Sequence, residues 1–185
     1  MTGLRCFVAV ELPKSMRDEV GRIEEGLRMP GLRLVKPDLC HITLKFLGDV
    51  PAQNIEKICE TLRSVRVAPF NVVVRGVGAF PGRSIRVVWL GLEGDFSDIF
   101  RQVEDTLSVL GFELERRKFS PHVTLGRVGS PSQELSSQIA IRLEKLARVD
   151  LGSVSVDRFF LKKSTLTREG PIYEDLAEFL LRPPG

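Results

Sequence analysis

The sequence predicts an α+β fold of two pseudo-symmetric lobes, each built strand–helix–strand–helix–strand, with antiparallel sheets flanking a central cleft. Two observations carry this prediction: helical and β-type apolar spacings alternate along the chain, and a histidine motif recurs 81 residues apart, at His41 and His122. Three other pairs match at this shift: Thr43 with Thr124, Leu44 with Leu125 and Gly48 with Gly129. We therefore expect residues 1–185 to form a single domain with an internal duplication, roughly 1–80 and 81–163 plus a C-terminal strand.

Four segments have the apolar spacing of amphipathic helices. Their apolar positions are Met16, Val20, Ile23 and Leu27; Ile55, Ile58, Cys59, Leu62 and Val65; Phe96, Ile99, Phe100, Val103, Leu107 and Leu110; and Leu135, Ile139, Leu143 and Leu146. The start of the fourth helix is the clearest, because Ser130 can be its N-cap, Pro131 its first helical residue and Gln133 the partner in a capping box.

Strand-like runs separate these helices. They cover residues 5–11, 42–47, 70–77, 85–92, 123–128 and 151–161. The C-terminal stretch 172–181 fits a strand face and a helix face equally well, so its structure is left open.

The composition excludes several classes of protein. No apolar run approaches the roughly 18 residues that a membrane span needs, and the first residues lack the features of a signal peptide, so we expect a cytoplasmic protein without membrane contact. The three cysteines form no CxxC pair, which argues against a disulfide framework. With two histidines an all-protein zinc site is not expected, and no metal or cofactor is predicted. The net charge of +3 permits an anionic ligand but falls short of the dense basic stripe of a DNA-binding domain.

Both histidines of the protein stand in one four-residue pattern, which reads His41-Ile42-Thr43-Leu44 and His122-Val123-Thr124-Leu125. Because side chains two residues apart on a strand share a face, each strand presents an imidazole beside a hydroxyl, and the apolar residues face the other way. A twofold relation between the lobes would bring the two strands together across a cleft. The sequence therefore predicts that both imidazoles and both hydroxyls converge on one small volume.

Two opposed imidazoles suit metal-free phosphoryl chemistry. A neutral histidine can take a proton from water or a ribose hydroxyl, and a protonated one on the other side can protonate the departing oxygen, as in-line displacement requires. Both forms are accessible near neutral pH because the unperturbed pKa of histidine is about 6.5. The threonine hydroxyls can donate to non-bridging oxygens, where charge builds up. A single histidine on a strand is usually just a satisfied polar group, but packing gives no reason to retain a titratable group twice.

Several separated stretches, in order along the chain, carry a family resemblance. They are FVAVELP (7–13), DLCHITLKFLG (38–48), RVVWLG (86–91), PHVTLGR (121–127), and Ser164 with Leu166 followed by GPIY (170–173). The chain resembles the two-histidine (2H) phosphoesterase superfamily and, within it, the RNA 2′,3′-cyclic phosphodiesterase branch, historically called 2′-5′ RNA ligase. The resemblance implies a bilobal α+β fold and the hydrolysis of an RNA 2′,3′-cyclic phosphate end to a 2′-phosphate, without a metal cofactor.

The resemblance also implies roles for the four motif residues. His41 and His122 are the expected catalytic pair, and Thr43 and Thr124 the expected contacts to the phosphate oxygens. The resemblance implies that His41 acts as a general acid for the 3′-oxygen and His122 as a base for water. The residues alone do not assign these roles, which exchange in the reverse, ligating direction.

Phe46 and Arg127 each follow a motif histidine by five residues. The resemblance makes both substrate-binding, Arg127 as a phosphate contact and Phe46 as a neighbour of the base or ribose. Strict strand alternation points both side chains away from the histidine face, so each needs a β-bulge or a strand end to reach the cleft. The alternatives are core packing for Phe46 and a solvated surface position for Arg127.

Other residues carry weaker indications. The run Arg116-Arg117-Lys118 directly precedes the second motif and is the best basic candidate for attracting the RNA backbone. Tyr173 and Trp89 are expected to be core or edge aromatics rather than stacking platforms.

The expected partner is RNA with a 2′,3′-cyclic phosphate end, such as a tRNA fragment, and a monomer is favoured. Two alternatives to hydrolysis stay open. The same residues run in reverse would give a 2′-5′ RNA ligase joining tRNA halves, and residues that bind without reacting would give a non-catalytic module holding RNA ends. Small cyclic nucleotides or ADP-ribose derivatives are a further substrate class.

Overall fold

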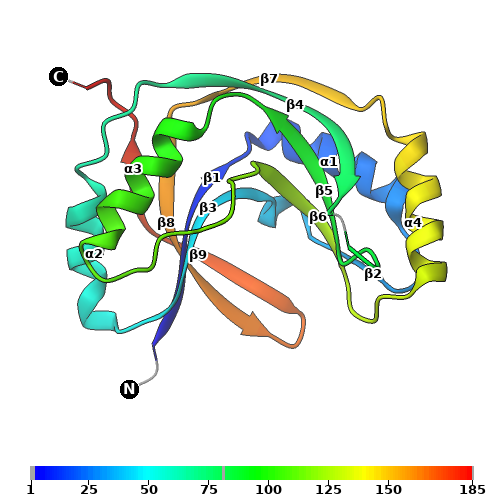
Figure 1. Cartoon of the computed structure of the whole chain (residues 1–185), viewed down its shortest axis with the longest axis horizontal. Coiled ribbons are helices and arrows are strands. Elements are labelled where there is room, and N and C mark those ends of the chain that lie inside the picture. Colours follow the sequence, from blue (N-terminus) through cyan, green and yellow to red (C-terminus); the bar gives the residue numbers. More distant parts are fainter. Residues whose placement is uncertain (1–2, 81, 185) are drawn as a thin grey trace.

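The computed structural model describes residues 3–80 and 82–184 of the chain and is shown in Figure 1. Short 3₁₀ turns at Pro37–Leu39 and Ala52–Asn54 precede the second long strand and the second helix. The described residues form β1 (Leu4–Glu11), α1 (Lys14–Leu27), β2 (Leu32–Leu34), β3 (His41–Val50), α2 (Ile55–Leu62), β4 (Phe70–Ala79), β5 (Val87–Glu93), α3 (Ser97–Ser108), β6 (His122–Val128), α4 (Gln133–Lys145), β7 (Asp150–Val156), β8 (Arg158–Thr167) and β9 (Gly170–Leu180).

The predicted α+β class is confirmed. Apart from the short β2, the elements β1 to β4 run strand–helix–strand–helix–strand, and β5 to β7 repeat this order before β8 and β9. The antiparallel strands join into one nine-stranded sheet in the order β7-β4-β5-β6-β3-β1-β8-β9, with β2 beside β6. The centre of this order is the contact between β3 and β6, where Ile42 lies opposite Val123. The two strands that carry the histidine motifs are therefore direct neighbours.

The two halves of the sequence are interleaved in space. β4, from the first half, pairs with β5 and β7, whereas β8, near the C-terminus, pairs with β1. The helices follow the same arrangement, because α2 lies beside α3 at one end of the molecule and α1 beside α4 at the other (Figure 1). Each side of the sheet, β7-β4-β5-β6 and β3-β1-β8-β9, thus combines strands from both halves of the sequence. The duplication of residues 1–80 in residues 81–163 stays a prediction.

The expectation of one long strand at 151–161 is wrong. The run divides at Asp157 into β7 and β8, which pair with different strands, β4 and β1. Both pieces alternate in the same way, so periodicity alone does not mark the division. The open C-terminal stretch is a strand, β9, whose full length pairs with β8.

The start of α4 also differs from its prediction. Its N-cap is Ser132 rather than Ser130, and the Ser132 hydroxyl accepts the backbone N–H of Leu135 at 3.1 Å. Gln133 is consequently the first helical residue and cannot close the predicted capping box. A serine three residues before a free N–H satisfies the helix start equally well, so the two serines compete for the same role.

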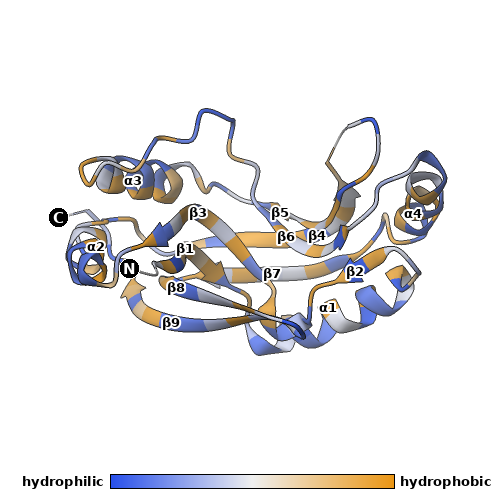
Figure 2. Cartoon of the chain, turned by 90° about the horizontal axis from the view of Figure 1, so that it is seen from below, coloured by the Kyte–Doolittle hydropathy of each residue, from blue (hydrophilic) through white to orange (hydrophobic). Residues whose placement is uncertain are grey.

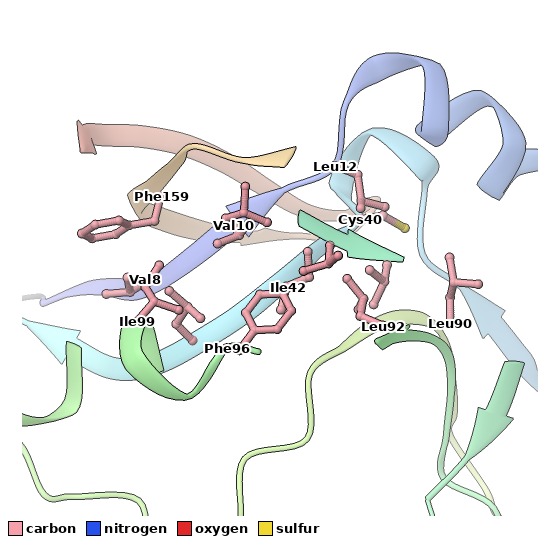
Figure 3. Packing of buried hydrophobic residues seen from close by; sticks show 14 of the residues in the cluster. Val8, Val10, Leu12, Cys40, Ile42, Leu90, Leu92, Phe96, Ile99 and Phe159 are labelled. Atoms are coloured by element: carbon pink, nitrogen blue, oxygen red, sulfur yellow. The ribbon is translucent and has the colours of Figure 1, made fainter. Parts of the chain in front are cut away.

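The hydrophobic core determines which face of the central strands is left for function. Ile42 and Val123 are 1% and 0% exposed, and Figure 3 shows Ile42 packed in one cluster with Phe96 and Ile99. The helices turn apolar stripes inward and polar residues outward (Figure 2). Burying one such aliphatic side chain contributes about 1.5–3 kcal/mol, so the register of β3 and β6 is strongly fixed. None of the helices in the described ranges is long and apolar enough to cross a membrane.

An ion pair is buried beneath the sheet, between β3 and α3. The Lys45 Nζ donates to both carboxylate oxygens of Glu104, at 2.8 and 2.7 Å, and both side chains are 6% exposed. Lys45 also donates to the backbone oxygen of Glu113. A charge this deep is tolerated only while its partner is present.

We expect Lys45→Met to lower the free energy of unfolding by about 3–5 kcal/mol, because it leaves the Glu104 carboxylate buried and unpaired. Urea unfolding at pH 7 measures this change. Lys57→Met, at an exposed position of α2, is the matched control and should stay within about 0.5 kcal/mol of the parent. Equal effects of the two substitutions would contradict the assignment.

Candidate functional site

The register of β3 and β6 brings the two motifs together. Ile42 lies opposite Val123 in an antiparallel pair, so extending the register by one residue sets His41 opposite Thr124 and Thr43 opposite His122. All four side chains are half-buried and lie on the face away from the core. Opposed Cβ atoms are about 5 Å apart and diagonal neighbours about 7–8 Å. The two imidazoles are therefore diagonal neighbours on this face of the sheet.

Both imidazole rings are held by the same device. The Nδ1 of His41 lies 2.7 Å from the backbone oxygen of Leu39, and the Nδ1 of His122 lies 2.8 Å from that of Ser120. In each case the acceptor is the carbonyl two residues earlier, so Nδ1 carries a proton and donates it. The Nε2 of each neutral ring is then left as the atom that can accept or deliver a proton in the site.

Matching β-bulges in both strands return the later residues to the histidine face. Along β3, Val8 lies opposite Lys45 but Ala9 lies opposite Thr43, which leaves Leu44 as the extra residue. β6 has the same shift, because Val88 and Trp89 of β5 lie opposite Gly126 and Thr124. Two successive residues in each strand then face the core, Leu44 and Lys45 in β3 and Leu125 and Gly126 in β6. After them, the residues at odd offsets from the histidine point to the histidine face.

Phe46 and Arg127 therefore lie on the same face as the histidines. A role in substrate binding requires this position, which strict strand alternation would not give to residues five positions after each histidine. Both are exposed, Phe46 to 63%, which argues against core packing for Phe46. The Phe46 ring is 6.0 Å from that of Phe7, which in turn is 4.8 Å from the His41 imidazole. The Arg127 guanidinium lowers the pKa of both histidines.

The pKa of both histidines is depressed, chiefly by burial. The pKa of His41 is lowered to about 4: burial is the largest cause and Lys162 and Arg127 add to it, while the bond to Leu39 and the Glu11 carboxylate act in the opposite direction. Burial likewise lowers the pKa of His122, with Arg127 adding to the effect. Without a ligand, both rings are accordingly neutral at pH 7.

A charged network adjoins His41. Glu11 lies opposite His41 on β1, and its carboxylate bonds to Lys162 at 2.5 Å and to Arg17 at 2.7 Å. Lys162 is 5% exposed and also pairs with Asp175. Opposite His122, the corresponding place on β5 is taken by Gly91. The two histidines thus have different electrostatic surroundings.

Each imidazole packs against an aromatic residue that was not among the site residues predicted from the sequence. The Tyr173 ring meets His41 edge-on at 5.3 Å, and Phe80 meets His122 edge-on at 4.8 Å. Tyr173 was expected to be a core or edge residue; its half-burial fits that, but its contact is with the motif. Trp89 packs so closely on Gly78 that a Cβ there would lie 2.5 Å from the indole. The family resemblance of the stretch 170–173 could have drawn attention to Tyr173. No local feature of the sequence indicates a contact between Phe80 and His122.

No group of three or more His, Cys, Asp or Glu side chains suited to a metal ion occurs within residues 3–80 and 82–184. Cys6, Cys40 and Cys59 are free and buried. The expectation of metal-free chemistry stays a prediction.

Comparison with known proteins agrees with the resemblance. The family model described as LigT like phosphoesterase matches residues 10–89 and 92–173. This match defines the class of the protein, a phosphoesterase. More narrowly, the chain belongs to the LigT-like phosphoesterase family.

Relatives match along nearly the whole chain. A protein of Methanothermobacter thermautotrophicus is 39% identical, with 96% of this chain and 99% of the relative covered. One of Methanocaldococcus jannaschii is 35% identical, with 95% and 100% covered. Both carry the name RNA 2′,3′-cyclic phosphodiesterase.

Solved structures give the same picture. A Thermus thermophilus protein superposes with a TM-score of 0.81 at 28% identity, covering 98% of this chain and 100% of the other. E. coli LigT complexed with 3′-AMP has a TM-score of 0.79 at 25% identity, with 97% and 98% covered.

We expect acid to destabilise the protein through His41. Its pKa is about 4 when folded and about 6.5 when unfolded, so the unfolded state binds more protons between these values and stability falls as the pH drops from 6.5 to 4. At pH 4.5 this costs about 2–3 kcal/mol. His41→Gln removes the effect, so urea unfolding at pH 7.5 and 4.5 should show a smaller acid loss in the variant. An identical loss in both proteins would contradict the prediction.

Removing Arg127 should raise the pKa of both histidines, because its positive charge disfavours both imidazolium ions. NMR titration of the two imidazoles in Arg127→Gln measures this directly, since the chain has two histidines. Arg63→Gln, an exposed arginine at the end of α2, is the control that should leave both titrations unchanged. A shift confined to one histidine would show that the charge of Arg127 does not act on both.

Proposed function

We propose that this protein hydrolyses the 2′,3′-cyclic phosphate end of RNA to a 2′-phosphate, with His41 and His122 as a metal-independent acid–base pair. The observation that carries the proposal is the β3–β6 register, which aligns two imidazoles with identical hydrogen-bond anchors on one face of the sheet. The names of the relatives support the substrate. We further propose a cytoplasmic monomer that acts on RNA fragments such as those of tRNA.

The reaction exchanges one P–O bond for another. The Nε2 of His122 takes a proton from water as the water oxygen attacks phosphorus, and the Nε2 of His41 gives a proton to the 3′-oxygen as the P–O3′ bond breaks. Opposite positions of base and acid fit in-line displacement. After one turnover His122 holds the proton that His41 lost, and exchange with solvent restores the pair.

His41 has to be protonated before it can act as the acid. Burial opposes this in the free protein, but an anionic phosphodiester beside the ring favours the imidazolium. The Glu11 carboxylate acts in the same direction. Substrate binding and proton uptake are therefore coupled, and the acid is loaded when the substrate is in place.

The remaining residues bind the substrate. The hydroxyls of Thr43 and Thr124 donate to the non-bridging oxygens, whose charge grows in the transition state. Arg127 adds a positive charge on the same face, and the exposed ring of Phe46 offers a surface to the terminal base or ribose.

The test is hydrolysis of an oligoribonucleotide with a 2′,3′-cyclic end, in EDTA, with identification of the phosphate that remains. His41→Gln and His122→Gln should each lower kcat by about 10²–10⁴-fold, with unfolding curves at pH 7.5 confirming that each variant is folded. Arg63→Gln should turn over normally. The pH profile should be bell-shaped, with limbs that belong to the coupled pair.

Other outcomes select other functions. Binding of the cyclic end without turnover at any pH would indicate a non-catalytic RNA-end module. Faster consumption in the presence of a 5′-hydroxyl RNA partner, with a joined product, would indicate ligation. Full turnover by either histidine variant would remove the mechanism.

A further inference from the structure

The buried ion pair of Lys45 and Glu104 is attached to a loop next to the site. Lys45 donates to the backbone oxygen of Glu113 at 2.7 Å, and the Glu104 carboxylate accepts the backbone N–H of Glu115 at 2.8 Å. The pair thus fastens the chain at two points just after α3. We call residues 113–118 the basic loop.

The basic loop presents three cations in succession. Arg116, Arg117 and Lys118 are all exposed, and no ion pair joins them to a carboxylate among the residues that the structure describes. The carboxylate of Glu115 accepts the backbone N–H of Arg117, which keeps it within the turn. The charges are therefore available to a ligand.

The loop is anchored on its other side as well. The ring of Phe119 stacks on Phe100 of α3, with centroids 4.3 Å apart and an angle of 15° between the planes. Three residues later the chain enters β6 at His122. A chain of four residues spans at most about 14 Å, so the Cα of Lys118 lies within that distance of the Cα of His122.

A second basic segment flanks the same strand. Figure 2 shows the loop between α3 and β6 rising on the same side of the sheet as the loop between β4 and β5. The latter carries exposed Arg83 and Arg86, and Arg127 of β6 lies opposite Val87, the residue that follows Arg86. Exposed basic residues therefore stand on the loop that precedes β6, on the loop that precedes β5 and on β6 itself.

We propose that Arg116, Arg117 and Lys118 form a subsite for the sugar–phosphate backbone of the RNA strand leading to the cyclic end, and that the Lys45–Glu104 pair positions this subsite. The inference rests on the proposed function and deepens it. Backbone contacts by arginine and lysine are independent of sequence and weaken with salt. A mononucleotide has no upstream backbone, so the subsite distinguishes oligonucleotides from mononucleotides.

The position of Lys45 explains why one motif carries this device and the other does not. Lys45 occupies the bulge of β3, and its counterpart in the bulge of β6 is Gly126. A Cβ on Gly126 would lie 3.0 Å from the side chain of Leu32, because β2 packs there. The space used by the lysine in β3 is closed in β6.

The experiment compares a decaribonucleotide ending in a 2′,3′-cyclic phosphate with 2′,3′-cyclic CMP. In the variant Arg116→Gln/Arg117→Gln/Lys118→Gln, KM for the decamer should rise about tenfold at low salt, and the slope of log(1/KM) against log[salt] should become shallower by about 2, since each contact to a single strand contributes about 0.7. The kcat/KM for cyclic CMP should change less than about twofold, because the mononucleotide does not reach these side chains.

The control variant, Arg142→Gln/Lys145→Gln/Arg148→Gln, removes the same charge around the end of α4. It should leave the ratio of the two substrates unchanged. An unchanged ratio in the basic-loop variant, or an equal loss in the control, overturns the subsite. Absence of turnover of either substrate by the parent protein instead overturns the proposed function, so the two failures are distinguishable.

The positioning role is tested by Lys45→Met/Glu104→Leu, which replaces the pair by apolar side chains of similar size and commonly preserves stability. If the double variant folds, it should lose its preference for the decamer even though the charges of the basic loop are intact. The loss should appear in KM rather than in kcat. Retained preference in a folded double variant overturns the positioning role. If this variant does not fold, the basic-loop variant still decides the subsite.

Discussion

The contact between β3 and β6 is the constraint on which the site depends. Ile42 and Val123 are both buried and directly opposed, so the hydrophobic core fixes how the two strands align. A shift of one residue would send the histidines into the core and the apolar residues to the surface. The geometry of the imidazole pair is thus maintained by packing energy on the far side of the sheet, without any direct bond between the two rings.

The paired bulges add a second layer to this arrangement. A regular strand offers two side chains on the site face for every four residues, which suffices for the imidazole and the hydroxyl. The extra residue in each strand resets the phase, so that Phe46 and Arg127 join the same face. The bulge also turns Lys45 into the core, where it reaches Glu104. One local irregularity therefore shapes both the face of the sheet that carries the histidines and the ion pair on the opposite face.

Much of the fold could be predicted because apolar periodicity is strong in its main elements. The helix containing Ile99 and Val103, for example, has an unmistakable inward stripe. The division at Asp157 could not be predicted, since pairing partners far along the chain decide it. The bulges left no shared sequence signal, because Leu44-Lys45 and Leu125-Gly126 differ in the second residue.

The motif residues could be identified because they repeat, whereas their surroundings do not repeat. Tyr173 reaches His41 from β9, and Phe80 reaches His122 from the end of β4. Both contacts depend on which strands become neighbours. A duplicated motif indicates the candidate catalytic groups in the sequence, but long-range topology decides what lies against each of them.

The differences between the two histidines have a chemical consequence. An acid and a base cannot be interchangeable within one reaction direction, yet the motifs, the hydrogen-bond anchors and the bulges are the same for both. The asymmetry lies in the residues around the two histidines. Glu11 and Lys162 adjoin His41, whereas Gly91 takes the place opposite His122. Glu11 favours the imidazolium of His41, whereas burial, the largest effect, and Lys162 oppose it, so protonation of His41 needs the negative charge of an arriving phosphate. His122 has no carboxylate opposite it, and burial lowers its pKa as well, so it starts neutral, as the base of the proposed reaction must.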